Sequence, residues 1–388
     1  MSTSPAAPAS PTERELMEFR SRFPILARRN YLNSCSLGAL SHDAEARLDD
    51  FRELWHTMGA SAWYEHWLGR LDELRAKAGA IHGAATEETA ILPSTSAALS
   101  VVADAVPTAG RTRVVCSELD FPTLAYQWRV KPEIELVVVP SGDGIGVSLE
   151  RFEEAVDERT LFVATSHVCY STGYVQDVAG IGEIARRAGA WSIIDGYQAA
   201  GQIAVDVEAL GVDVYTSGPL KWLCGGPGLA WLFVRADRIA EMKPRFTSWF
   251  AARDQFDFRL DAFEFRDDAR RFELGTPALP TVHTALGGIE ALESFGLDRV
   301  QARIRALTAR LVEGCREAGF SLRTHPDPER RSGIVMIAHD DPAEAVRRLD
   351  ERDIVVDHRP GHVRVSPHAY NTEAEVDEVV AALAGMYT

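Results

Sequence analysis

The fold is decided by residues 191–235, which read WSIIDGYQAAGQIAVDVEALGVDVYTSGPLKWLCGGPGLAWLFVR. An apolar run at 191–194 ends in Asp195, a pattern typical of a fully buried strand with a carboxylate at its carboxyl end. A second apolar run, at 212–215, leads through a turn of small residues to Lys221. Ligands of open α/β sheets bind beyond the carboxyl ends of the strands. We therefore expect Asp195 and Lys221 to face the same crevice.

A lysine and a carboxylate at one crevice favour chemistry on an aldehyde. A lysine amine can form a Schiff base with a carbonyl compound. Pyridoxal phosphate needs such a lysine, together with an acid that keeps its pyridinium nitrogen protonated. For either residue alone, a structural ion pair at the strand ends is the simpler interpretation. The pair, followed by the glycine cluster at 225–228, favours a binding site for this cofactor.

The order of motifs along this stretch resembles the class V aminotransferase family of fold-type I pyridoxal-phosphate enzymes. The motifs are Asp-x-x-Gln, a short strand, Ser-Gly-x-x-Lys and a glycine-rich turn. The resemblance extends from Tyr31 to the C-terminus and indicates the kynureninase-like and isopenicillin-N-epimerase-like branch. It implies that Lys221 forms the Schiff base, that Asp195 pairs with the ring nitrogen and that Gln198 donates to the ring hydroxyl oxygen. It also implies that Ser217 binds the cofactor.

The same resemblance implies the architecture of an α/β protein of fold-type I. A mostly parallel seven-stranded sheet is expected in a large domain, with a smaller α/β domain at the C-terminus. A Ser-, Pro- and Ala-rich lead-in at 1–20 is typical of disorder. We expect an N-terminal segment at 21–50 that joins the small domain, a large cofactor-binding domain at 51–285 and the small domain at 286–388. The strand–helix–strand order at 161–195 predicts parallel pairing with a right-handed crossover.

Two further motifs are expected to bind the cofactor. Pro-Ser-Thr-Ser precedes an Ala-rich helical pattern at 97–106, and exposed amides at a helix start bind phosphate well. Plain helix capping is the alternative, but the resemblance assigns Thr95 and Ser96 to the phosphate. Phe121 lies in a Phe-Pro-Thr segment that resembles one in kynureninases, where the aromatic side chain covers the pyridine ring. A lone Phe after a strand is otherwise a core residue.

Two motifs imply a homodimer with shared active sites. The segment 247–250, Thr-Ser-Trp-Phe, resembles the kynureninase segment whose tryptophan reaches the phosphate of a neighbouring subunit. For Trp249, a domain interface is the alternative. The segment 271–277 resembles the class V motif Phe-Glu-x-Gly-Thr-Pro. Its threonine, here Thr276, is implied to cap the phosphate of the partner subunit's cofactor.

Four residues are expected to bind the substrate. The segment 364–372, RVSPHAYNT, resembles the class V ending Arg-x-Ser-x-x-x-Tyr-Asn-Thr. Arg364 is implied to hold the substrate α-carboxylate in a two-point contact that lysine cannot supply, with a surface ion pair as the alternative. Kynureninase-like motifs add Asn33, which follows a short strand near the N-terminus, Tyr170 of His-Val-x-Tyr and Arg359 of Asp-x-Arg.

These motifs imply a pyridoxal-phosphate-dependent enzyme that acts on an α-amino acid through an external aldimine. Lys221 is then expected to move the α-proton. A class V aminotransferase, a C–S or C–C lyase and an amino-acid epimerase remain open. The absence of cysteine from 333–372 argues against a desulfurase, which needs a nucleophilic thiol there. Gln198 and Leu220 stand where kynureninases carry His and Tyr, which argues against true kynureninase activity.

Two other classes of protein fit the sequence less well. A dinucleotide-binding dehydrogenase would need a Gly-x-Gly-x-x-Gly turn after its first strand, with an acid about 20 residues on, and the sequence lacks this arrangement. A cofactor-free scaffold would have no reason to keep the motif residues together. The set in question is Asp195, Gln198, Lys221, Thr276 and Arg364.

Composition and charge set further limits. The formal net charge of −16 argues against nucleic acid or an anionic membrane as a partner. No run approaches the roughly 18 apolar residues of a membrane helix, and the N-terminus lacks the pattern of a signal peptide. The five cysteines are odd in number and show no metal-pair spacing. We therefore expect no metal, reduced thiols and a cytoplasmic location.

Overall fold

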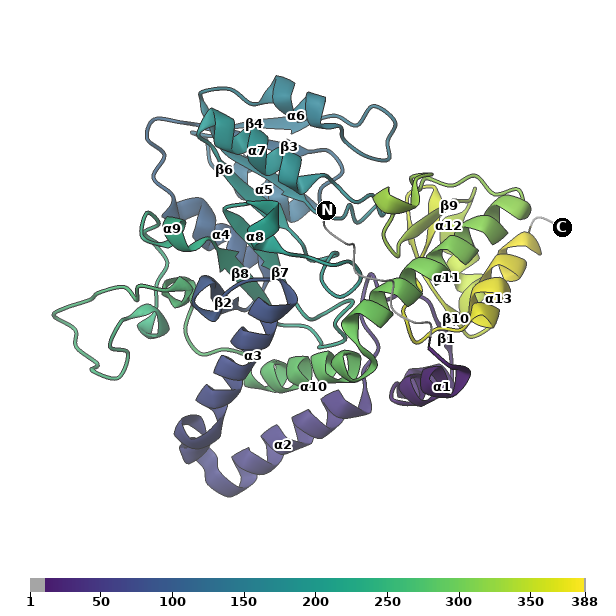
Figure 1. Cartoon of the computed structure of the whole chain (residues 1–388), viewed down its shortest axis with the longest axis horizontal. Helices are drawn as coiled ribbons and strands as arrows, with labels where there is room; N and C mark the ends of the chain where they lie inside the picture. Colours follow the sequence, from purple (N-terminus) through teal and green to yellow (C-terminus); the bar gives the residue numbers. More distant parts are fainter. Residues whose placement is uncertain (1–10, 387–388) are drawn as a thin grey trace, which may run out of the picture.

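The protein is built around a seven-stranded sheet (Figure 1), seen here in a computed structural model that describes residues 11–386. Strands β4, β3, β5, β6 and β7 pair in parallel, whereas β8 pairs antiparallel to both β7 and β2. The expected mostly parallel seven-stranded sheet is therefore confirmed. In the order of the sheet, its strands are β2 (Thr89–Leu92), β8 (Ala230–Val234), β7 (Val214–Ser217), β6 (Trp191–Asp195), β5 (Thr160–Ser166), β3 (Arg113–Ser117) and β4 (Glu135–Val139).

The central strands form where the sequence is continuously apolar. Every residue of β5 and β6 is buried, as expected for parallel strands covered by helices on both faces. Helix α7 (Val178–Ala188) connects the two strands and confirms their predicted parallel pairing. It begins after Asp177, whose side chain accepts a hydrogen bond from the Gly180 amide, and it ends at Gly189 in the left-handed conformation (φ 67°).

The other helices of this part pack against the sheet or against each other. Ser41 caps α2 by accepting a hydrogen bond from the Ala44 amide. A glycine, Gly296 at φ 96°, separates two long C-terminal helices. The helices are α2 (His42–Met58), α3 (Leu68–Ile81), α4 (Thr95–Ala105), α5 (Pro122–Arg129), α6 (Leu149–Ala155), α8 (Val207–Leu210), α9 (Ala236–Ile239) and α10 (Leu279–Phe295).

A second, smaller unit lies beside the large sheet in Figure 1 and consists mainly of the C-terminal residues. Its antiparallel sheet has the order β11-β12-β9, and a separate short strand, β10, pairs in parallel with β1 from the N-terminal segment. The N-terminal segment therefore contacts this unit, while the exact domain boundaries stay predictions. The elements are β1 (Asn30–Tyr31), α11 (Leu297–Glu317), β9 (Val335–Ala338), α12 (Pro342–Asp350), β10 (Ile354–Val355), β11 (Asp357–Arg359), β12 (His362–Val365) and α13 (Glu373–Ala384).

The predicted disordered lead-in at 1–20 is wrong in its second half. Helix α1 (Glu13–Ser21) begins with a reciprocal pair of hydrogen bonds between Thr12 and Glu15, a capping box that the sequence reading overlooked. The helix buries Phe19, whose ring stacks on Phe295 at a centroid distance of 4.2 Å. Residues 1–10 lie outside the described part of the chain.

Within residues 11–386, no helix combines the length and the apolarity that a membrane span requires. The same residues contain no group of three or more His, Cys, Asp or Glu side chains arranged to hold a metal ion.

Candidate active site

A cavity of about 240 Å³ brings together seven of the predicted site residues. It lies at the carboxyl ends of β5 and β6 and at the N-terminus of α4, where open α/β sheets bind their ligands. Its lining consists of Ser94, Thr95, Ser96, Phe121, Thr123, Ser166, Val168, Tyr170, Asp195, Tyr197, Gln198, Leu220 and Lys221. The expectation that Asp195 and Lys221 face one crevice is therefore confirmed.

Asp195 is the last residue of β6 and points into the cavity from the sheet. Its side chain is buried, and its Oδ1 accepts a hydrogen bond of 2.9 Å from the Tyr197 amide. Burial raises the pKa of this carboxyl above its usual value, while the Tyr197 amide and the charge of Lys221 oppose that rise. The turn after β6 thus fixes an acid at the floor of the cavity.

The backbone around Lys221 is fixed by the N-terminal segment. The Gly38 amide donates to Leu220 O at 2.9 Å, directly before the lysine. A Cβ atom at position 38 would lie 2.1 Å from Lys221 O, so only glycine permits this approach. The Ser-Leu-Gly turn at 36–38 therefore packs against the lysine loop.

The Lys221 amine has a lowered pKa, which suits a nucleophile or a base. Its partial burial lowers its pKa to about 8, and the nearby Cys35 and Asp195 only partly offset this effect. The Nζ atom lies 5.2 Å from the centroid of the Tyr197 ring. An amine with such a pKa has a substantial neutral fraction near neutral pH, unlike an ordinary lysine.

Gln198 is held in one orientation by groups that the sequence did not reveal. Trp222 Nε1 can only donate, and it donates to Gln198 Oε1 at 2.9 Å. Gln198 Nε2 donates to Cys35 O, also at 2.9 Å. The amide nitrogen therefore has one N–H left for a ligand in the cavity. Trp222 could not be identified from the sequence because a tryptophan after the lysine is also typical of the core.

The start of α4 offers a site for an anion. Ser94 caps this helix of 11 residues, and its side chain accepts from the Ala97 amide at 3.1 Å. Thr95 Oγ1 is buried and has no hydrogen-bond partner among residues 11–386. Helix N-terminal amides and an unpartnered hydroxyl in one cavity wall suit a phosphate group. Ser96 lines the same wall, so both predicted phosphate residues reach the cavity.

Aromatic side chains form another wall. Phe121 is 45% exposed, and its ring meets that of Tyr170 edge to face at a centroid distance of 5.2 Å. Asp120 fixes the loop before Phe121, because its carboxylate accepts from the Ser117 and Ser166 amides, both at 2.7 Å. Burial raises the pKa of Asp120 to about 6 despite these hydrogen bonds. This role could not be predicted from the sequence, because Ser166 is far away along the chain.

Arg364 lies behind the cavity wall rather than in it. It is 1% exposed, and its Nη1 donates to Tyr170 O at 3.1 Å. Its Nη2 donates to Ser36 Oγ at 2.7 Å and to Asp357 Oδ2 at 2.6 Å, across the β11–β12 pair. Burial opposes ionisation of Asp357, but the His358 amide and the two arginines at 359 and 364 lower its pKa to about 2. The ion pair considered as an alternative is therefore present, but its arginine is buried rather than on the surface.

Three other predicted residues lie outside the cavity lining in this chain. Ser217 is fully buried and its Oγ donates to Gly196 O at 3.1 Å, so its hydroxyl is used by the turn. Asn33 forms an isolated parallel β-bridge with Ser366. Arg359 lies 5.9 Å from the centroid of the Tyr170 ring and donates to Asp357 at 2.8 Å.

The two residues predicted to serve a partner subunit lie on the surface. Trp249 is 39% exposed, and Thr276 is also exposed. Two larger hollows, of about 490 and 520 Å³, border the Trp249 loop and contain no lysine. The loop exposes further apolar side chains, namely Phe246, Phe256, Phe258, Leu260 and Phe263.

Comparisons with known proteins agree with the fold. A family model described as aminotransferase class-V matches residues 57–379. The uncharacterized aminotransferase YcbU of Bacillus subtilis (strain 168) is 32% identical over 368 residues, which cover 94% of this chain and 97% of YcbU. The kynureninase of Geobacillus thermodenitrificans (strain NG80-2) is 26% identical, with 95% of this chain and 90% of the kynureninase covered.

Solved structures share the fold at lower identity. A cysteine desulfurase from Thermococcus onnurineus NA1 is 21% identical, with a TM-score of 0.85 and coverage of 95% of this chain and 97% of that one. The cystine C–S lyase C-DES with cysteine persulfide is 20% identical, with a TM-score of 0.86 and coverage of 93% and 99%. In another C-DES structure, glycine is covalently linked to the pyridoxal phosphate (PLP) cofactor. The chain therefore belongs to the aminotransferase class-V family of PLP-dependent fold-type I enzymes.

Proposed function

We propose that Lys221 carries PLP through its ε-amino group and then moves the proton on the α-carbon of an amino-acid substrate. The observation that carries this proposal is the meeting of Lys221 and Asp195 in one cavity. A lysine whose pKa is lowered to about 8 is partly neutral near neutral pH, as both a nucleophile and a general base require.

The residues that line the cavity fit the cofactor. The unpartnered Thr95 hydroxyl and the α4 amides suit its phosphate, and Ser96 adds a second hydroxyl. Asp195 is a buried acid suited to the ring nitrogen. The half-exposed ring of Phe121 supplies an apolar surface for the planar cofactor.

PLP, when bound, withdraws electrons from the bond that breaks at the α-carbon of the substrate. The Asp195 carboxylate keeps the ring nitrogen protonated, which sustains that withdrawal. Gln198 would donate its second Nε2 hydrogen to the ring hydroxyl oxygen of bound PLP, since Cys35 O accepts only one of the two hydrogens. The Lys221 amine, once free, takes the α-proton and returns a proton to the product.

The substrate is an α-amino acid whose carboxylate is bound by Arg364, with Tyr170, Arg359 and Asn33 around it. Support comes from the hydrogen bond that joins Arg364 to Tyr170 O, since Tyr170 lines the cavity. The charges of Arg364 and Arg359 also lower the pKa of Lys221, so both guanidinium groups act on the same site.

We propose aminotransferase-type chemistry first, because YcbU is named as an aminotransferase and is 32% identical. A C–S or C–C lyase, of desulfurase or kynureninase type, and an epimerase are the second candidates. Residues 333–372 contain no cysteine, and Leu220 rather than tyrosine precedes the lysine, which disfavours both named lyases.

We further propose a homodimer in which Trp249 and Thr276 bind the cofactor phosphate of the partner. The exposure of both residues and the apolar loop around Trp249 support a shared interface. Mixing inactive Lys221→Ala chains with impaired Thr276→Ala chains should restore activity through hybrid dimers. A fully active monomer in sedimentation would contradict this arrangement.

A cytoplasmic location is also a proposal. It is supported by the five free cysteines, all of them buried, which form no disulfide in the described residues. Cell fractionation tests it, and recovery of the protein outside the cytoplasmic fraction would contradict it.

The function is tested by incubating the holoenzyme with a panel of amino acids in D₂O. We expect at least one of them to gain deuterium at its α-carbon, detected by mass spectrometry, and we expect no gain with Lys221→Ala. A 2-oxo acid product identifies an aminotransferase, the opposite enantiomer an epimerase and a released side-chain fragment a lyase. A cofactor-loaded enzyme that exchanges no α-proton would contradict the proposal.

A further inference from the structure

Arg364 has no free edge with which to bind a carboxylate at two points. A guanidinium offers two such edges, Nε with Nη2 and Nη1 with Nη2, and both include Nη2. The two hydrogens of Arg364 Nη2 are donated to Asp357 and to Ser36. One Nη1 hydrogen goes to Tyr170 O, while Nε is buried and has no partner in the described part of the chain. A two-point contact therefore requires that Nη2 be released.

The group that occupies Nη2 is itself a carboxylate. Asp357 Oδ2 lies 2.6 Å from Arg364 Nη2, and it also accepts from Ser36 Oγ at 3.0 Å. With a pKa lowered to about 2, Asp357 is ionised throughout the physiological range. It therefore holds the position that the carboxylate of a substrate would take.

A second arginine offers Asp357 another partner. Arg359 Nη1 donates to the same Oδ2 atom at 2.8 Å. Asp357 can therefore leave Arg364 without losing an oppositely charged neighbour. The two arginines and Asp357 carry a net charge of +1, from two positive charges and one negative charge. One substrate carboxylate would neutralise this cluster.

We propose that Asp357 is a built-in counterion that occupies Arg364 in the absence of substrate and pairs with Arg359 when an α-carboxylate binds. This inference rests on the proposed role of Arg364. Asp357 thereby determines how tightly the enzyme binds a carboxylate, and its return to Arg364 promotes release. The Asp357 side chain is 29% exposed, whereas that of Arg364 is 2% exposed, so the acid is the partner with room to move.

The test compares L-alanine with ethylamine, which lacks the carboxylate, by titrating the absorbance of the holoenzyme. Asp357→Asn keeps the size and an acceptor oxygen but removes the competing charge. We expect it to raise the affinity for L-alanine about tenfold or more and to leave that for ethylamine unchanged. In turnover, the KM for the carboxylate substrate should fall, and kcat should fall or stay constant as release slows. Asp357→Glu should restore the original ratio of affinities.

Arg359→Met provides a second variant should Asp357→Asn fail to take up cofactor. Without Arg359, Asp357 stays on Arg364, so binding of L-alanine should weaken several-fold while that of ethylamine does not. The effect of Arg359→Met should vanish when it is combined with Asp357→Asn, which a direct contact of Arg359 with the substrate would not produce.

The inference is overturned if Asp357→Asn leaves the ratio of the two affinities unchanged, or weakens both ligands equally as a merely structural acid would. It is also overturned if Arg359→Met leaves L-alanine binding unchanged. Arg364→Met separates this failure from failure of the proposed function. If Arg364→Met does not reduce the preference for L-alanine, then Arg364 does not bind the carboxylate, whatever Asp357 does.

Discussion

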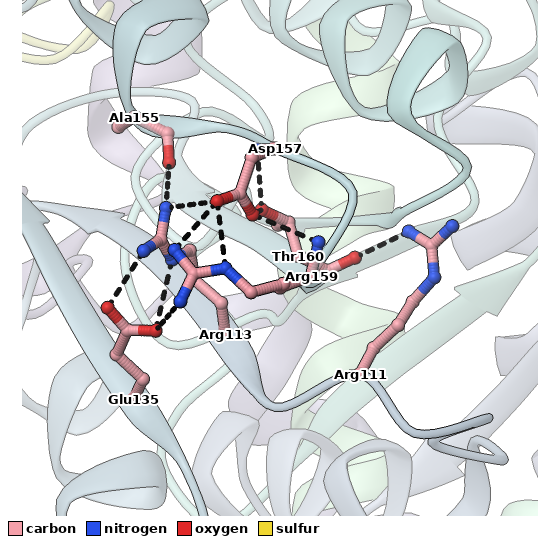
Figure 2. A network of polar contacts seen from close by, with 7 residues as sticks. All are labelled: Arg111, Arg113, Glu135, Ala155, Asp157, Arg159 and Thr160. Atoms are coloured by element: carbon pink, nitrogen blue, oxygen red, sulfur yellow. Dashed lines mark hydrogen bonds and ion pairs between the residues drawn. The ribbon is translucent and has the colours of Figure 1, made fainter.

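The two ends of the central sheet differ in whether their charged side chains are paired. At the amino ends of β3, β4 and β5, four side chains form a closed network (Figure 2). Arg113 pairs with Glu135 at 2.8 Å and with Asp157 at 2.7 Å, and Arg159 pairs with the same two acids at 3.2 and 2.8 Å. Every charge in this network has an opposite charge from the chain itself.

At the carboxyl ends of the strands, some polar groups lack an ion-pair or hydrogen-bond partner among residues 11–386. Lys221 forms no ion pair within residues 11–386, and the Thr95 hydroxyl has no partner there. Asp195 accepts from one backbone amide. Leaving buried polar groups without partners costs stability, so such groups persist where a ligand completes them. The amino end of the sheet serves stability, and the carboxyl end serves binding.

The largest effect should follow from Lys221→Ala, which removes the reactive amine. Turnover should fall by about a thousandfold or more, because both attachment of the cofactor and proton transfer are lost. The Tm of the cofactor-free protein should not fall, since a partly buried amine with a lowered pKa is removed. Lys77→Ala is the matched control, and its turnover should stay unchanged. If the two variants had comparable turnover, Lys221 would have no role in the reaction.

Asp195→Asn should lower turnover by at least about 100-fold with little change in Tm. The amide oxygen can still accept the hydrogen bond from Tyr197, so the turn is kept, but the neutral side chain cannot hold the ring nitrogen protonated. Steady-state kinetics and thermal unfolding measure the two effects. Near-normal turnover would show that Asp195 does not contact the ring.

Replacing an acid that lies between two arginines should have a smaller effect. It changes how the stability of the fold depends on pH. Asp357 has a folded pKa of about 2, below its unfolded value of 3.8, so its stabilisation is present above pH 3.8 and is lost as pH falls through 2. The difference corresponds to about 2 kcal/mol. Asp357→Asn should therefore flatten the acid limb of stability measured by denaturant unfolding.

Asp157→Asn is the matched variant in the network of Figure 2. Burial opposes ionisation of Asp157, but Arg159 and Arg113 lower its pKa. Asp157→Asn should therefore also flatten the acid limb of stability. The effect should be smaller, because Arg159 is 53% exposed whereas Arg364 is 2% exposed. A larger acid-range effect at Asp157 than at Asp357 would reverse the comparison between the two regions.

Arg113→Met should have the smallest effect. Its side chain is 15% exposed, and loss of its two ion pairs should lower the Tm by about 1–3 °C, less at high salt. Turnover and cofactor content should not change, because the network lies at the other end of the sheet. A loss of turnover would show that the two ends are coupled.

The sequence predicted those features that depend on local pattern. Continuous apolar runs predicted β5 and β6, and polar residues after such runs placed Asp195 and Lys221 at one cavity. The start of α4 followed from the Pro-Ser-Thr-Ser segment, in which Ser94 caps the helix. The capping box of Thr12 was equally local, but it was overlooked because the surrounding composition is typical of disorder.

The features that could not be predicted depend on contacts between distant residues. The carboxylate of Asp357 accepts hydrogen bonds from Ser36, near the other end of the chain, and from Arg364. Arg364 is therefore paired within the chain, whereas the motif predicted a guanidinium open to substrate. Asp120 and Trp222 likewise act through partners that no motif specifies. The Ser217 hydroxyl is directed to Gly196 O by the shape of the turn, which the motif alone does not reveal.

The central claim is that Lys221 carries the cofactor, and borohydride reduction tests it most directly. Reduction of the yellow holoenzyme should fix the cofactor covalently on one peptide. Digestion and mass spectrometry should then find the pyridoxyl label on Lys221. A label on Lys77, Lys131 or Lys243, or no stable label on a protein that contains the cofactor, would contradict the account.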